Sequence, residues 1–231
     1  MFRKMYLLLL FLTLPLLAEN WPGWRGPAGN GISQSNVLPE SWSEESNIDW
    51  RLTLAGPAAS TPILWNDKLF LTSTKGNDFL VMAVSTEGKV LWEDVVGTGN
   101  KSFRQGESNY AAPSPSTDGE KVYAFFGNGD LVGYTVNGKQ VWKRNLADEF
   151  GAFNMYFGMA SSPLLHKGNL YVLLMHSDAQ LVLSIDKSTG ETVWKHNRKT
   201  NARRDNLHYY DSPMIYENEN VTQLIIHGSD V

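Results

Sequence analysis

Cysteine is missing from the 231 residues of this chain. A sequence without cysteine forms no disulfide and carries no lipid on a lipobox cysteine, so packing alone must hold the fold together. Basic residues are also in the minority, because 20 Lys and Arg stand against 24 Asp and Glu, for a formal net charge of −4. Nonspecific nucleic-acid binding requires a positive field, so we predict no nucleic-acid partner.

Motifs of catalysis and metal binding are absent as well. The chain has no G-x-S-x-G nucleophile motif, and its five histidines form no H-x-x-x-H pair. We therefore identify no catalytic residue and no metal-binding motif, and we predict no bound cofactor. Helical periodicity is lacking after residue 18, so no helix is expected there.

Only one long hydrophobic run is present, and it lies at the start of the chain. Residues 1–18 combine Arg3 and Lys4 with an apolar stretch over residues 6–17 and the small residue Ala18. This layout is typical of a signal peptide and is short for a membrane span. We expect cleavage after Ala18, with a soluble product in the bacterial periplasm or outside the cell. An uncleaved anchor is the alternative.

Tryptophan and glycine, in contrast, recur together in a repeated signature. The copies are Gly88-x-x-x-Trp92, Gly138-x-x-x-Trp142 and Gly190-x-x-x-Trp194, with a glycine-less relative that ends at Trp50. Successive tryptophans lie 42 to 52 residues apart, which is the period of one propeller blade. We expect each indole on the outermost strand of its blade, wedged between blades and lying over the backbone of the next one. The glycine is expected to let the preceding turn come close.

A second marker runs in phase with the tryptophans. It consists of Thr61-Pro62, Ser114-Pro115, Ser162-Pro163 and Ser212-Pro213. Between the two markers, apolar runs of five to seven residues alternate with Asn-Gly and Asp-Gly turns, which is typical of short antiparallel strands. Each unit is therefore predicted to be a four-stranded antiparallel meander.

These patterns predict an all-β chain that forms part of a β-propeller. About 3.5 blades fit the sequence, which would be the first half of a seven- or eight-bladed ring. The predicted propeller occupies residues 19–231: blade 1 at 60–97, blade 2 at 112–147, blade 3 at 160–199, an incomplete blade 4 at 211–231, and a closing strand of the last blade at 47–54.

Two stretches resemble a known repeat family. The segment from Ser184 to Trp194, which includes Asp186 and Gly190, resembles the A-x-D-x-x-T-G-x-x-x-W repeat of pyrroloquinoline-quinone (PQQ) propellers. The sequence Trp21-Pro22-Gly23-Trp24-Arg25-Gly26-Pro27 resembles the mature start of exported bacterial proteins of this superfamily, which are described as PQQ-like or BamB-like.

The resemblance implies two alternative functions. One branch of the superfamily is the quinoprotein dehydrogenases, which hold PQQ and calcium on the propeller axis and oxidise alcohols or sugars. The other branch has lost the cofactor and serves as a docking platform. Many dehydrogenases of the first branch carry adjacent cysteines, and this chain has none. We therefore favour a scaffold for a protein or envelope polymer partner. A purely structural envelope component is a third possibility.

Three long, aromatic loops are the candidate binding site. They occupy residues 103–110, 153–159 and 205–211, where each outer strand connects to the inner strand of the next blade. The predicted lining is Arg104, Glu107, Asn109, Tyr110, Asn154, Tyr156, His208, Tyr209 and Asp211. Glu107 and Asp211 have the oxygen ligands that calcium prefers. Aromatic residues here could instead plug the channel, and the basic cluster at 198–204 is either a solvated loop or an anion contact.

Overall fold

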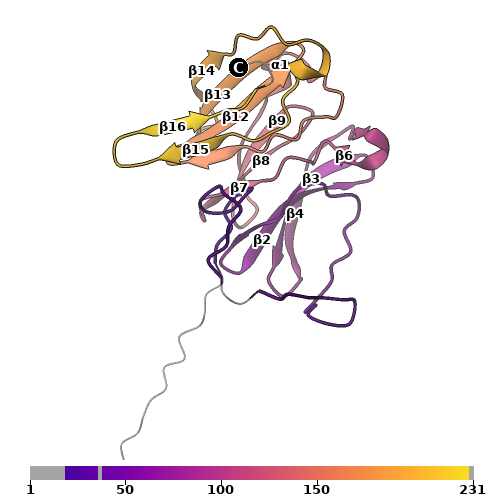
Figure 1. Cartoon of the computed structure of the whole chain (residues 1–231). Helices are drawn as coiled ribbons and strands as arrows, with labels where there is room; N and C mark the ends of the chain where they lie inside the picture. The colour runs from indigo at the N-terminus through magenta and orange to yellow at the C-terminus, as the bar shows by residue number, and fades with distance from the viewer. Residues whose placement is uncertain (1–18, 36–37, 229–231) are drawn as a thin grey trace, which may run out of the picture.

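The computed structural model describes residues 19–35 and 38–228, so the predicted signal peptide at 1–18 lies outside the described residues. Three antiparallel four-stranded sheets follow one another along the chain (Figure 1). The first comprises β1 (Ile63–Trp65), β2 (Lys68–Lys75), β3 (Asp78–Ser85) and β4 (Val90–Thr98). The second comprises β7 (Ser116–Thr117), β8 (Lys121–Phe125), β9 (Asp130–Thr135) and β10 (Gln140–Asn145). The third comprises β11 (Leu164–His166), β12 (Asn169–His176), β13 (Ala179–Asp186) and β14 (Thr192–Asn197).

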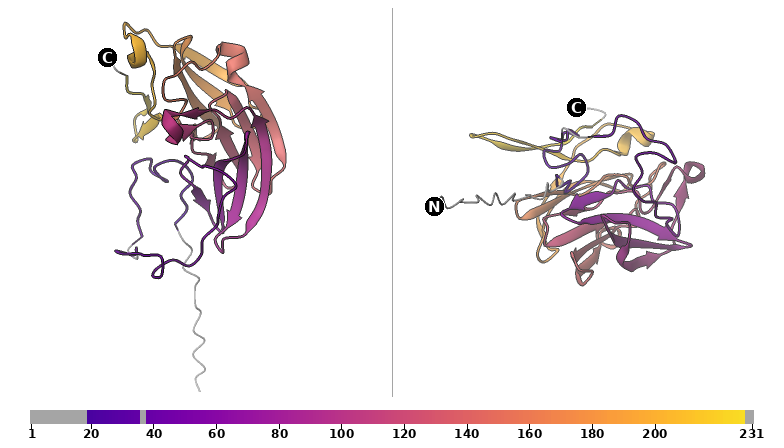
Figure 2. Two further views of the ribbon diagram at one scale, coloured as in Figure 1. Left: turned by 90° about the vertical axis from the view of Figure 1, so that its right-hand side faces the viewer. Right: turned by 90° about the horizontal axis from the view of Figure 1, so that it is seen from below.

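Two smaller sheets complete the described part. Strands β15 (Met214–Glu217) and β16 (Thr222–Ile225) form a hairpin after the third sheet, and β5 (Ser102–Phe103) pairs with β6 (Ser108–Asn109) in a loop. In the left view of Figure 2, the sheets succeed one another along one side of the molecule, and the indigo N-terminal segment lies on the other. The prediction of an all-β chain built from four-stranded propeller blades is confirmed. Residues 47–54 form no strand here, and their role in closing a last blade stays a prediction.

The expectation of no helix after residue 18 was wrong. A short helix, α1, spans Leu146–Phe150, and 3-10 turns occupy Arg104–Gly106 and Arg204–Leu207. Helix α1 forms because the Asn145 side chain accepts hydrogen bonds from the backbone N–H groups of Ala147 and Asp148. Five residues are too few to show a helical period, so the periodicity test had nothing to detect.

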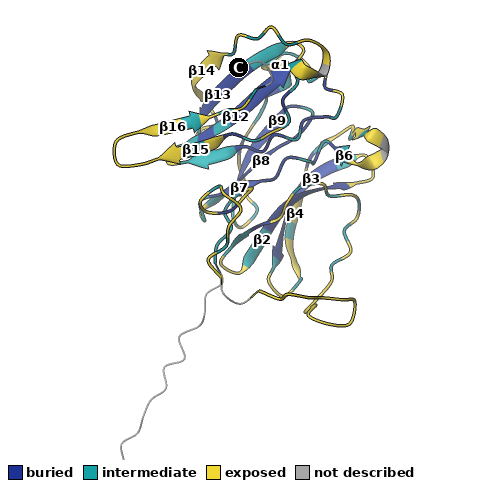
Figure 3. Ribbon diagram, in the orientation of Figure 1, coloured by how far each residue is buried: buried dark blue, intermediate teal, exposed yellow. Residues whose placement is uncertain are grey.

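The middle strands are buried on both faces (Figure 3). The second sheet lies between the first and the third, whereas residues 52–58 pack on the other face of the first sheet, and Tyr209, Leu224 and Ile226 pack on that of the third. Phe79 and Val81 of β3 pack in one cluster with Phe126, Val132 and Tyr134 of the second sheet. Alternate residues of that second sheet turn the other way, toward β12 and β13 of the third sheet. Successive side chains of a strand point to opposite faces, so each middle strand contributes to two hydrophobic layers. This apolar area is buried only when the sheets stack.

The repeated pairs of glycine and tryptophan join different units. The indole Nε1 of Trp92 donates to the carbonyl of Val136 (3.0 Å), and that of Trp142 donates to the carbonyl of Lys187 (3.0 Å). A Cβ on Gly138 would lie 2.8 Å from the Trp92 ring, and one on Gly190 would lie 2.7 Å from the Trp142 ring. The glycine therefore receives the indole of the preceding unit, which is a more specific role than letting a turn come close.

The outer two tryptophans of the series differ in their surroundings. Trp50 repeats the contact, since its Nε1 donates to the carbonyl of Thr86 (2.7 Å) and its ring lies against Gly88. Trp194 lies against Tyr171 of its own sheet, with ring centroids 5.9 Å apart, and is 41% exposed. Asp186 accepts hydrogen bonds from the backbone N–H groups of Ser188 and Thr189, which shapes the turn that leads to Gly190.

The Ser-Pro markers form a relay of hydrogen bonds between units. The hydroxyl of Ser114 accepts from the Thr61 backbone N–H (2.9 Å), and Ser162 accepts from the Ser114 N–H (2.9 Å). Ser212 in turn accepts from the Ser162 N–H (2.8 Å). Each serine thus satisfies a backbone donor at the start of the preceding unit's inner strand, which ties the inner strands together.

We expect Ser162→Ala to lower the free energy of unfolding by about 1–3 kcal/mol, because the buried N–H of Ser114 would lose its acceptor. Ser184→Ala is the matched control, since Ser184 is fully buried and its hydroxyl has no hydrogen-bond partner among the described residues. Urea denaturation of both variants measures the difference. Equal losses would show that the relay adds no stability.

Candidate functional site

The structure brings the three predicted loops together on one face, which we call the loop face (residues 103–110, 153–159 and 205–211). The Arg104 guanidinium lies 4.6 Å from the centroid of the Phe157 ring. On the other side of the middle loop, Tyr156 lies 5.4 Å from His208, and Phe157 lies 5.3 Å from Tyr210, between ring centroids. The middle loop is thus held between its two neighbours.

A cavity of about 380 Å³ opens on the loop face. Three of the predicted residues line it: Asn154, Tyr156 and His208. The remaining lining residues are Lys101, Phe153, Met155, Ser177, Arg204 and Leu207. Lys101, Ser177 and Arg204 were missed, because Lys101 and Arg204 lie just outside the aromatic loop cores and Ser177 belongs to the β12–β13 turn.

Ser177 and His208 form a polar pair in this cavity, with 3.0 Å between Oγ and Nε2. The backbone N–H of Tyr156 donates to Nδ1 of the same imidazole (3.4 Å), so Nε2 carries the proton and donates to Ser177. The Ser177 hydroxyl in turn donates to the Asn154 carbonyl (3.3 Å). This network links the middle loop, the third loop and the β12–β13 turn.

Three other predicted residues hold the loops in place instead of lining the cavity. Asn109 is 4% exposed and accepts a hydrogen bond from the Ala111 N–H (2.8 Å). Tyr110 packs edge-on against Phe79, and Tyr209 is 9% exposed in the core cluster behind the face. Burial raises the pKa of the Tyr209 phenol. Some polar and aromatic residues of these loops therefore pack inside and support the loop face, and others are exposed on it. Tertiary packing decides which residues do which.

The two carboxylates considered as calcium ligands do not converge. Glu107 pairs with Arg104 at 3.8 Å on the surface, and Asp211 is exposed outside the cavity lining. Among residues 19–35 and 38–228, no group of three or more His, Asp or Glu side chains could hold a metal ion. Glu107 and Asp211 therefore do not form one calcium site with each other.

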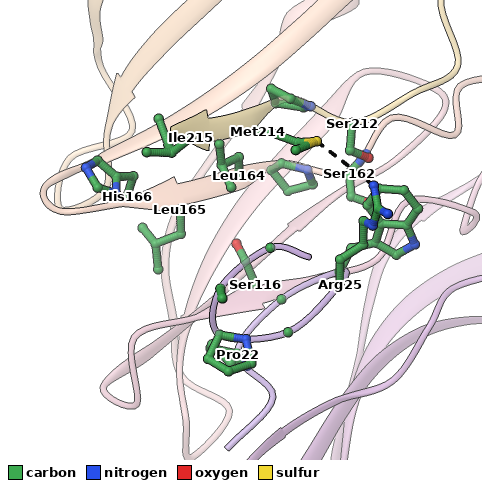
Figure 4. Close-up of a pocket in the computed structure, with 18 of the residues that line it drawn as sticks. Pro22, Arg25, Ser116, Ser162, Leu164, Leu165, His166, Ser212, Met214 and Ile215 are labelled. Atoms are coloured by element: carbon green, nitrogen blue, oxygen red, sulfur yellow. Dashed lines mark hydrogen bonds between the residues drawn. The ribbon is translucent and has the colours of Figure 1, made fainter. Parts of the chain in front are cut away.

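A second cavity, of about 370 Å³, lies on the axis between the inner strands and residues 22–29 (Figure 4). Trp21 pairs with Leu64 of β1 through two backbone hydrogen bonds of 2.7 and 2.9 Å. The Pro22 carbonyl accepts from the Thr117 N–H (2.8 Å), and Arg25 reaches the Met214 sulfur (4.0 Å). The N-terminal segment therefore contacts the inner strands of the first, second and last sheets, a role that the sequence had not suggested.

Polar groups on the inner strands face this axial cavity. Ser116 is 2% exposed, and its hydroxyl has no partner among the described residues. At the far end of β15, Glu217 accepts from the Lys167 ammonium (2.6 Å), and this hydrogen bond lowers the pKa of the Glu217 carboxyl. The cavity is mainly apolar, with Leu164, Leu165 and Ile215 on its strand side.

Comparison with solved structures places this architecture among quinoprotein folds. The quinohemoprotein alcohol dehydrogenase of Comamonas testosteroni matches with a TM-score of 0.59 and 16% identity, over 77% of this chain and 27% of that one. A europium-containing methanol dehydrogenase matches at 0.45 and 14% identity, over 63% and 26% of the two chains. BamB from Moraxella catarrhalis matches at 0.42 and 14% identity, over 68% and 42%. The first likeness shows the fold alone, and the chain spans about a quarter of that dehydrogenase.

No curated protein matches the chain. Within the described ranges, no helix is both long and apolar enough to cross a membrane. A protein-family model described as outer membrane protein assembly factor BamB matches residues 41–224. Because this match extends over most of a 231-residue chain whose sheets repeat as propeller blades, the chain belongs to that BamB-like PQQ-repeat family.

Proposed function

We propose that this protein is an exported propeller that docks a protein or envelope polymer partner on its loop face, without a bound cofactor. The observation that carries the proposal is the cavity formed by the middle and third inter-blade loops together with Lys101 and Ser177, where Tyr156 is 62% exposed. An exposed aromatic ring beside polar groups is a typical anchor for a partner. The family's description as an assembly factor supports the same role.

The alternative is a PQQ- and calcium-dependent dehydrogenase of alcohols or sugars. The likeness to the Comamonas testosteroni enzyme favours it at the level of fold. Against it, the two candidate calcium ligands do not converge, because Glu107 pairs with Arg104 on the surface and Asp211 lies outside the loop-face cavity. PQQ with calcium should therefore leave the visible spectrum of the protein unchanged and support no dye reduction with alcohols or aldoses. A bound quinone with turnover would overturn the docking proposal.

Site-specific crosslinking tests the docking face directly. A photoreactive amino acid at position 156 should give a discrete crosslinked product in cells that express the protein. The same group at position 87, an exposed residue in the β3–β4 turn, should give none. Once the product is identified, Tyr156→Ala should weaken its binding about tenfold, as for other exposed aromatic anchors. Products of equal yield at both positions would remove the loop face as the docking site.

A further inference from the structure

Two cations share the loop-face cavity. Lys101 comes from the segment after β4, and Arg204 comes from the segment after β14, 103 positions further along the chain. No ion pair to either side chain is found within the part of the chain that the structure describes. Asp178, in the β12–β13 turn, accepts a hydrogen bond from the Asn154 amide (3.1 Å) and does not line the cavity.

Arg104 is a third cation on this face. Arg104 and Arg204 each begin a 3-10 turn and each has a left-handed backbone, with φ of 45° and 59°. Such a conformation is unfavourable for a residue with a side chain, and strained positions of this kind cluster at functional sites. Both arginines occur in corresponding connections between an outer and an inner strand, on either side of the middle loop. Both of these strained backbone positions are thus occupied by arginines on the same side of the molecule.

Local charge here opposes the charge of the whole chain. The chain has a formal net charge of −4, yet the loop-face cavity is lined by two cations and by no carboxylate among its described side chains. Neighbouring cations without counterions repel one another, and an anionic ligand relieves that repulsion. A neutral glycan would gain nothing from this arrangement, so the chemistry points to an anion.

The spread of the cations favours an extended ligand over a compact one. Arg104 lies over Phe157 and pairs with Glu107 at 3.8 Å in an exposed contact, while Lys101 and Arg204 border the cavity beside Tyr156. Arg104 does not line the cavity that Lys101 and Arg204 share, so an extended peptide with successive carboxylates suits all three cations better than one compact anion held in the cavity. The exposed Tyr156 ring lines the same cavity as Lys101 and Arg204 and suits an apolar side chain of a peptide.

We propose that the loop face binds an acidic segment of a partner protein, with its carboxylates on Lys101, Arg204 and Arg104. This inference rests on the proposed docking function and specifies the chemistry of the partner.

The test uses the full chain and a fluorescein-labelled peptide of alternating Glu and Gly. Fluorescence anisotropy should show binding that weakens with added salt, and Lys101→Glu with Arg204→Glu should weaken it at least about tenfold. The control is Lys89→Glu with Lys139→Glu, which changes the net charge equally at exposed turns of β3–β4 and β9–β10. If the reversal variant misfolds by circular dichroism, Lys101→Gln with Arg204→Gln replaces it and should give a smaller loss in the same direction.

Several outcomes would overturn the inference. They are the absence of binding, equal weakening in the control pair, or equal affinity for the Lys and Gly peptide. Tighter binding of an anionic polysaccharide than of the acidic peptide would reassign the ligand. If crosslinking at position 156 still yields a partner in any of these cases, the docking function stands and only its acidic-peptide chemistry fails.

Discussion

Trp142→Ala is expected to lower the free energy of unfolding by about 3–5 kcal/mol, the range for removing a buried tryptophan. The indole is 9% exposed and stacks on Tyr123 of its own sheet, with centroids 6.1 Å apart. It also donates to Lys187 and covers Gly190 in the third sheet. The substitution would therefore open a cavity at the junction of two sheets and remove a hydrogen bond between them.

Trp194→Ala is the matched control for that prediction. It occupies the same place in the third signature but is 41% exposed, so its loss should cost less than about half as much. Urea denaturation followed by circular dichroism measures both variants. A loss below about 1 kcal/mol for Trp142→Ala, or equal losses for the two, would show that the interblade contact is not the source of stability.

The second large effect is a loss of stability between pH 6.5 and pH 4, caused by His176. Its side chain is fully buried at the end of β12, with its ring 4.7 Å from that of Phe153. Burial lowers the pKa of this imidazole to about 4, although Asp178 acts in the opposite direction. The Nε2 atom has no hydrogen-bond partner among the described residues, so no hydrogen bond stabilises a proton there.

The sign of the effect follows from the two protonation states. The unfolded chain takes up a proton near pH 6.5, whereas the folded protein resists it until about pH 4. Stability is therefore complete above pH 6.5 and falls by about 3 kcal/mol as the pH approaches 4. His176→Gln should flatten this slope, and His196→Gln, at an exposed position, should leave it unchanged. Denaturation at pH 7, 5.5 and 4.5 measures it; an unchanged slope in His176→Gln contradicts the assignment.

Strand positions were largely predictable because their signals are local. The apolar run at residues 140–145 coincides with β10, and the run at residues 121–126 ends one residue beyond β8. Alternating apolar residues and Asn-Gly turns act within a few residues of one another, so the sequence alone carries them. Helix α1 was not predictable in this way, since a single Asn145 cap decides it.

The candidate site was predictable as a set of loops and not as a set of contacts. Loop length and aromatic content indicated residues 103–110, 153–159 and 205–211. Which side chains line the cavity depends on how the loops pack. Asn109 and Tyr209 belong to the predicted loops but are buried, whereas Lys101 and Arg204 lie just outside those loops and line the cavity. A cavity's lining is a property of three dimensions, and spacing along the chain does not encode it.

By itself the sequence determined the repeat, its strands and the family they resemble, since each unit carries its own turn chemistry and alternating pattern. Only the tertiary structure decided that Trp142 covers Gly190 of the next unit, that Ser162 serves the backbone of Ser114, and that Trp21 joins β1. These contacts join residues more than 40 positions apart, and they form only when stacked sheets exclude water between units.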